Sequence, residues 1–241
     1  MKRRLSLRLL FIAVLAVVTL ALVGWLYFYD QGDPEIDTTM MQKRAEAGHM
    51  NSRFALGEAY RLGRGKEKDM VQAYRWHMKA ALQGHVGSQY TLGLILEGGE
   101  GVRQNLAKAF EWYSLAAKMG DLVEAEFAMG LMYFHGRGVT QDYAEAFDLF
   151  EKTARKGHLV AQYLLGAMYE EGWVNGRDFV EAYKWYTLAL PGRDAAIALN
   201  PLYDPRRALD RLIPRMTKFQ IRRAKQAIKD WRFDNEDPFD N

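Results

Sequence analysis

One glycine recurs along this 241-residue chain at intervals of 36, 37 and 36 residues, and its surroundings recur with it. The four copies are Gly57, Gly93, Gly130 and Gly166. Each comes directly after a leucine or methionine and three positions after an aromatic residue. An alanine and an aromatic residue follow it at positions sixteen and seventeen. A period of this length is typical of small structural units that stack in one direction.

Each unit is predicted to contain two helices. The aromatic residue, the leucine, the glycine and a residue three positions later share one stripe of a first helix, and the later alanine and aromatic positions define a second. Glycines between them favour the left-handed backbone that ends a helix. The second helices are expected to begin after side chains that accept backbone N–H bonds. These are Asp69, Asn105, Asp142 and Asp178. One such pair cannot bury its own apolar face, so the units must stack.

The repeated residues resemble the Sel-1-like repeat, an α/α relative of the tetratricopeptide repeat. The third unit carries much of that pattern, with Ala125, Gly130, Tyr133, Gly136 and Asp142. The resemblance covers residues 48–190 and implies an all-α solenoid of four helix-pair repeats. The departures from the pattern are Lys66, Leu149, Thr153 and the loop residues Trp173, Val174 and Asn175.

Both ends of the array are expected to be capped. Ala45 and Gly48 align with Ala81 and Gly84, so residues 37–47 are predicted to form a lone second-type helix over the first repeat. After the array we expect a loop over 191–204, basic capping helices over 205–232 and an acidic tail over 233–241. Thr217 and Gln220 have the spacing of a capping box at the start of the last helix.

The chain begins with a basic segment, residues 1–8, and then has no charged residue from 9 to 29. That run is long enough to span a bilayer, with aromatic residues at its far end, so we predict a transmembrane signal anchor followed by a linker over 30–36. A cleaved signal peptide is the alternative. The positive-inside bias puts the N-terminus in the cytoplasm. The repeats are then expected in the periplasm, on a single-pass inner-membrane protein.

Little in the sequence indicates catalysis. The absence of cysteine excludes thiol nucleophiles, Cys-ligated metals and disulfides, and no serine-nucleophile, zinc-protease or phosphate-loop motif occurs. His49, His85 and His158 occupy one position of units one, two and four, with Asp121 in that place in unit three. Positions a unit or more apart are too far to share one metal, so these residues are interpreted as helix-start residues. We expect no enzyme activity, no cofactor and no metal, and a small-molecule ligand is not favoured.

Two groups of residues are candidates for binding. In the related tetratricopeptide arrangement the first helices line a concave face, and mapping by position predicts partner contacts there. These are Glu58, Arg61, Glu97, Phe134, His135, Glu170 and Glu171. Phe134 and His135 replace polar residues of neighbouring units and are a candidate aromatic anchor. The second group is a basic C-terminal patch. It comprises Arg215, Lys218, Arg222, Arg223, Lys225 and Lys229.

Residues 206–232, which include this patch, contain ten basic residues and two acidic ones. It is open to three interpretations: a solvated face of a capping helix, a contact with a partner or an anionic surface, and nucleic-acid binding. Export across a membrane argues against nucleic acid. The sequence as a whole predicts a non-enzymatic scaffold that binds protein partners and is held in the membrane by its N-terminal helix. The alternatives are a cell-wall or polysaccharide accessory factor that binds glycan, and a β-lactamase-like envelope enzyme.

Overall fold

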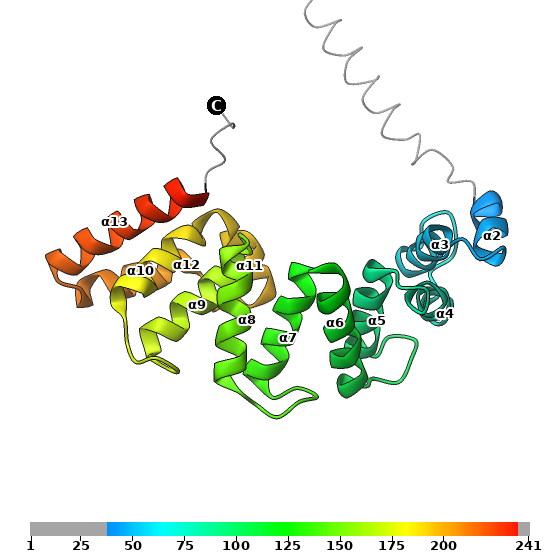
Figure 1. Ribbon diagram of the computed structural model, residues 1–241, viewed down its shortest axis with the longest axis horizontal. Coiled ribbons are helices and arrows are strands. Elements are labelled where there is room, and N and C mark those ends of the chain that lie inside the picture. The colour runs from blue at the N-terminus through cyan, green and yellow to red at the C-terminus, as the bar shows by residue number, and fades with distance from the viewer. Residues whose placement is uncertain (1–37, 236–241) are drawn as a thin grey trace, which may run out of the picture.

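The computed structural model describes residues 38–235, and the regular structure in this range is helical. The helices stack side by side in an arc from α2 to α13 (Figure 1). The α-helices are α2 (Thr38–Glu46), α3 (Met50–Leu62), α4 (Met70–Ala81), α5 (Val86–Gly98), α6 (Leu106–Gly120), α7 (Val123–His135), α8 (Tyr143–Arg155), α9 (Leu159–Glu171), α10 (Phe179–Leu188), α11 (Arg193–Leu199), α12 (Pro205–Leu212) and α13 (Lys218–Asn235). Units one to four are the pairs α3/α4, α5/α6, α7/α8 and α9/α10, and α2 packs on α3.

The helix ends follow the sequence signals. Asp69, Asn105, Asp142 and Asp178 each precede a second helix and accept hydrogen bonds from its first backbone N–H groups, which confirms them as N-caps. His85 and His158 do the same for α5 and α9 through Nδ1, at 3.0 and 3.1 Å.

Two of the predicted helix-start residues behave differently from the rest. His49 makes no side-chain cap. Asp121, predicted to start a helix, instead ends α6 with a left-handed backbone (φ 48°). The 37-residue interval inserts one residue here, and the aspartate takes the conformation that a glycine has in neighbouring units.

The repeat glycine lets the two helices of a unit approach each other closely. A Cβ on this glycine would lie 2.8, 2.3, 2.7 and 2.8 Å from the ring of the residue twenty positions later. Those rings belong to His77, Tyr113, Phe150 and Tyr186. All four rings are buried. The recurring glycine is therefore a packing requirement, since any side chain would occupy the space of the facing ring.

Replacing Gly93 by alanine is expected to destabilise the protein by about 2 kcal/mol, because the new methyl group would overlap Tyr113 at 2.3 Å. Gly98 lies in the same helix and has nothing within 4 Å, so Gly98→Ala is the matched control and should be neutral or slightly stabilising. Urea unfolding of both variants tests this. Equal midpoints would contradict the close approach.

The residue four positions before each repeat glycine joins neighbouring units. In units one, two and four it is Arg53, Gln89 or Gln162, and its side-chain nitrogen donates to a carbonyl near the end of the preceding second-type helix, at 3.1, 3.4 and 3.1 Å. The acceptors are the carbonyls of Ala45, Ala81 and Ala154. Each of these carbonyls also accepts the N–H of the glycine three residues later, so the side chain adds a second hydrogen bond at the end of the helix.

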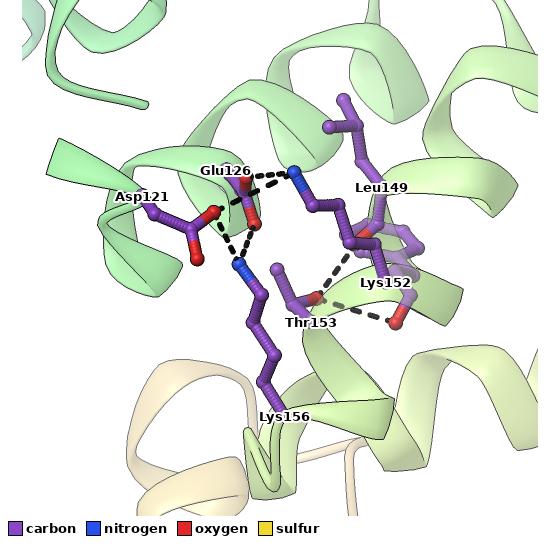
Figure 2. Close-up of polar contacts among 7 residues, drawn as sticks. Asp121, Glu126, Leu149, Lys152, Thr153 and Lys156 are labelled. Carbon is purple, nitrogen blue, oxygen red and sulfur yellow. Dashed lines mark hydrogen bonds and ion pairs between the residues drawn. The ribbon is translucent and has the colours of Figure 1, made fainter. Parts of the chain in front are cut away.

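Unit three has Glu126 at this position, and an ionised carboxylate cannot donate. Figure 2 shows the substitute arrangement, in which Lys152 of α8 and Lys156, the residue that follows α8, bind the two carboxylate oxygens. Lys152 binds Oε1, while Lys156 donates to Oε2 at 3.1 Å and to Asp121 at 2.6 Å. Glu126 is only 3% exposed, so this pairing is what makes a charged group tolerable there.

The C-terminal segment closes the array but contains one helix that we did not predict. The expected loop over 191–204 is wrong for residues 193–199, which form α11 and pack on α9. Its alanine-rich sequence favours a helix, and Pro191 and Gly192 form a single 3-10 turn before it. In α13, Ala224 and Ile228 are buried in the core shared with units three and four. The capping box is confirmed, because the Thr217 N–H donates to Gln220 and the Gln220 N–H donates to Thr217.

The predicted segments at 1–8, 9–29 and 30–36 lie outside the described residues, as does the end of the acidic tail. Among the helices of residues 38–235, none combines the length and the hydropathy that a membrane span requires.

Candidate functional site

Four of the predicted contact residues occupy one repeat position, four places after the repeat glycine. They are Arg61, Glu97, Phe134 and Glu170. In units two, three and four this residue contacts the ring twenty positions after the glycine, on the second helix of the same unit. Glu97 and Glu170 therefore already form hydrogen bonds within the array.

In unit two, Glu97 accepts a hydrogen bond of 2.7 Å from the Tyr113 hydroxyl, and Arg137 from the next unit lies 2.9 Å from its other oxygen. Burial, with the neighbouring Glu97 charge added, raises the pKa of Tyr113. Glu97 thus joins the two helices of its unit and links that unit to the next.

In unit one, the polar contact to the second helix comes from Glu58, one position after the repeat glycine, and not from the residue four positions after it. Arg61 donates twice to Glu58, at 2.9 and 2.7 Å, and His77 Nε2 lies 3.2 Å from Glu58 Oε1. Burial alone would raise the pKa of Glu58, but the hydrogen bonds from His77 and Arg61 outweigh it and bring that pKa to about 2. Both charged residues remain partly exposed, so they stay candidates for the edge of a binding surface.

Glu170 is not a surface residue, which corrects its assignment as a partner contact. It is 1% exposed and accepts a bond of 2.9 Å from the Tyr186 hydroxyl. Arg211 donates to it at 3.0 Å, and Arg215 binds the other carboxylate oxygen. Burial would raise the pKa of Glu170, but the hydrogen bonds from Arg211 and Tyr186 lower it. The side chain therefore fastens the C-terminal cap to unit four, and Glu171 beside it is exposed.

Unit three replaces the polar pair by rings, and here an exposed surface remains. The Phe134 ring lies 6.0 Å from Phe150 and gathers two further rings, Tyr143 at 5.5 Å and Trp173 at 5.2 Å. Tyr143 and Trp173 face each other at 5.5 Å with an interplanar angle of 31°. We call Phe134, Tyr143 and Trp173 the aromatic platform.

The platform is partly open to solvent, and the side chain of Gln141 holds two of its residues in place. Tyr143 is 40% exposed and Trp173 is 44% exposed. The amide of Gln141 donates to the Phe134 carbonyl at 2.8 Å and to the Tyr143 hydroxyl at 3.1 Å. His135 packs edge-on against Phe134 and is exposed. Burial and the nearby Arg137 charge lower the pKa of His135. Three preordered rings of this kind have the composition of an interface hot spot.

The loops of units two and three each contain a second glycine, which packs on the start of the second helix of the preceding unit. Gly101 lies over Met70, and Gly138 lies over Leu106, each the first residue of the second helix one unit earlier. A Cβ on these glycines would meet those residues at 2.5 and 2.6 Å, and both glycines have positive φ. Each loop therefore closes down on the preceding unit.

Unit four has Val174 where that glycine would stand. A β-branched residue disfavours positive φ, and in this loop the left-handed conformation moves on to Gly176. The residue that the loop would have covered is Tyr143, which stays exposed with Trp173 against it. The platform thus lies where Val174 replaces the glycine that units two and three have in this loop. The sequence singles out Trp173 and Phe134 but not Tyr143, whose position is apolar in every unit and resembles a core position.

The basic patch lies on the C-terminal cap, on α13 and the 3-10 turn Ile213–Arg215 before it, and α13 packs on α10 of unit four. Lys218, Arg222, Arg223, Lys225 and Lys229 are all exposed. Arg215 is committed to Glu170 and also stacks on the Phe179 ring at 4.7 Å. Within residues 38–235, no three His, Asp or Glu side chains gather in a way that would hold a metal ion.

The fold and the platform define a helical-repeat solenoid with an exposed aromatic surface, and comparison with known proteins names the family. The Sel1 repeat model matches residues 51–85, 86–121, 123–158 and 159–190, so the chain belongs to the Sel1 repeat family and the prediction of four repeats is confirmed. Proteins of this family generally serve as non-catalytic scaffolds that bind other proteins.

Solved structures agree with this assignment. A Sel1 repeat protein from Oxalobacter formigenes is 33% identical over 73% of this chain and 70% of its own, with a TM-score of 0.62. A protective antigen of uropathogenic Escherichia coli is 24% identical over 81% of this chain and 48% of its own, with a TM-score of 0.51, and supports the fold alone. No curated protein matches the chain.

Proposed function

We propose that this protein is a membrane-anchored scaffold that binds a protein partner on its aromatic platform. The observation that carries the proposal is the trio of Phe134, Tyr143 and Trp173, in which Tyr143 and Trp173 are exposed and Phe134 is partly buried beneath them. Gln141 fixes Phe134 and Tyr143, and the loop beside them has Val174 in place of a glycine. An aromatic surface already held in one arrangement loses little side-chain entropy on binding. The fitting partner is an extended segment that offers an apolar or aromatic side chain to the rings.

The experiment is a pull-down of the full chain from native membranes. Trp173→Ala is expected to reduce recovery of the specific partner at least tenfold, since central aromatic anchors carry about 2 kcal/mol or more of binding energy. Leu82→Ala is the matched control, because Leu82 is 74% exposed but lies on unit one, away from the platform. Partners recovered equally by both variants, with unchanged thermal stability, would overturn the assignment.

Glycan binding is the second candidate, and the exposure of Tyr143 and Trp173 favours it, because flat exposed rings also suit the apolar faces of sugars. Retention of the full chain on purified cell-wall polysaccharide, lost in Trp173→Ala and kept in Leu82→Ala, would favour glycan over protein.

The anchor over residues 9–29 and the periplasmic position of the repeats are part of the proposal, and they rest on the uncharged run and its basic flank. The absence of native cysteine gives a direct test. A single Leu82→Cys variant should react with a membrane-impermeant maleimide in intact spheroplasts. Labelling only after lysis would place the repeats in the cytoplasm.

A further inference from the structure

The last helix carries a straight row of positive charge that the proposed function does not use. Five basic residues of α13 recur at spacings of four, three, four and three positions. They are Lys218, Arg222, Lys225, Lys229 and Arg232, which we call the basic stripe. This spacing keeps them on one face of the helix over about 21 Å. All five are exposed.

The stripe lies beside the face that α13 buries. Ala224 is fully buried and Ile228 is 8% exposed, so the helix is fixed on the array and the row of cations is held outward. No ion pair joins a stripe residue to a carboxylate among residues 38–232, whose side chains the structure describes. By contrast, Arg193, Arg211 and Arg215, just before α13, are all paired.

An exposed ring accompanies the stripe. Phe219 is 60% exposed and lies next to Lys218 in the first turn of α13. Consecutive residues of a helix point about 100° apart, so Phe219 projects to one side of the stripe. A fixed helix with aligned cations and an exposed ring at its first turn suits a membrane interface, where the charges meet anionic headgroups and the ring enters the acyl boundary.

We propose that the basic stripe docks α13 on a bilayer surface rich in anionic phospholipid. The inference rests on the anchored part of the proposed function, because the linker over 30–36 reaches at most about 25 Å and would keep the array close to the membrane. The stripe adds a second attachment at the far end of the solenoid, so the array lies along the bilayer and its orientation is fixed. Nucleic acid is the rival polyanion, but an exposed phenylalanine beside the cations and an exported domain favour lipid.

The test uses the full chain reconstituted in phosphatidylcholine vesicles with and without 30% phosphatidylglycerol. Gln226→Cys, on the exposed side of α13, carries a fluorophore, and a headgroup-labelled nitroxide lipid quenches it when the helix lies on the surface. We expect at least fivefold stronger quenching with phosphatidylglycerol, and loss of that difference at 0.5 M salt because exposed charges are screened. The same label at Leu82→Cys should show no dependence on lipid charge.

Two charge-reversal variants test whether the lipid dependence comes from the stripe or only from the net charge of the protein. Lys218→Glu, Lys225→Glu and Lys229→Glu together should abolish the phosphatidylglycerol dependence. Arg75→Glu, Arg103→Glu and Lys108→Glu change the net charge equally at exposed sites on other helices and should preserve it. Equal quenching in both triple variants, or quenching that ignores lipid charge, would overturn the proposal. So would tight salt-sensitive binding of a duplex DNA oligomer that only the stripe variant loses, with no lipid-dependent quenching.

Flotation distinguishes failure of the anchor from failure of the stripe. A chain that floats with pure phosphatidylcholine vesicles has its anchor, whatever the stripe does. A chain that floats only with phosphatidylglycerol, and loses this in the stripe variant, lacks the anchor and retains the stripe contact.

Discussion

Replacing Glu170 by alanine is expected to lower the free energy of unfolding by about 2–4 kcal/mol, because it leaves the buried Tyr186 hydroxyl without its partner and removes two ion pairs to partly exposed arginines. Three groups lose their partner at once: the Tyr186 hydroxyl, Arg211 and Arg215. The two arginines come from 41 and 45 residues further along the chain, so the variant also loosens the C-terminal cap from unit four.

The matched control is Glu171→Ala. Glu171 is the next residue of the same helix, carries the same charge and is exposed, so its replacement should change stability by no more than about 0.5 kcal/mol. Urea unfolding, followed together with hydrogen exchange of α12 and α13, measures both effects. Two variants of equal stability would show that Glu170 is a surface residue after all.

Adding a buried negative charge in unit four is expected to lower the free energy of unfolding nearly as much as removing Glu170. Gln162 is 2% exposed and donates to the Ala154 carbonyl, whereas the equivalent Glu126 of unit three is paired with Lys152 and Lys156. Unit four has Leu188 and Gly192 in place of those lysines. Gln162→Glu would bury an unpaired carboxylate and break the bond to the carbonyl, at a cost of about 3 kcal/mol at pH 7.

The pH dependence gives this prediction a clear sign. Burial raises the pKa of an unpaired carboxyl above its unfolded value, so the folded state binds the proton more tightly. The deficit of Gln162→Glu relative to wild type should therefore be smaller at pH 5 than at pH 7. Glu126→Gln is the control and should cost less than about 1 kcal/mol, since units two and four already use glutamine there and the two lysines can turn to solvent. A deficit of Gln162→Glu that does not change with pH would contradict this account.

The sequence predicted the repeating part of the molecule well, because its signals are local. The glycine spacing, the four N-cap residues and the Thr217–Gln220 capping box each involve residues within one or two helical turns of one another. The helix at residues 193–199 was missed because Pro191 and Gly192 resemble a loop when read alone.

The candidate site was harder to predict because it depends on contacts between units. Position along the first helix suggested that Glu170 faces a partner, and nothing near it in sequence announces Arg211 or Arg215. The aromatic platform goes with a missing loop glycine, because Val174 stands where units two and three have the glycine that packs on the preceding unit. A comparison of the four loops with each other, rather than with the family pattern, would have raised that possibility.

The central claim is that the aromatic platform is the surface on which a partner docks, and in-cell photocrosslinking tests it most directly. A photoreactive benzophenone amino acid at Val174, which is 37% exposed and adjoins Trp173, should yield one discrete crosslinked protein in native membranes. Adding Trp173→Ala to the same chain should abolish that product, and the photoreactive residue at Leu82 should not form it. The same product at Leu82, or its persistence without Trp173, would contradict the claim.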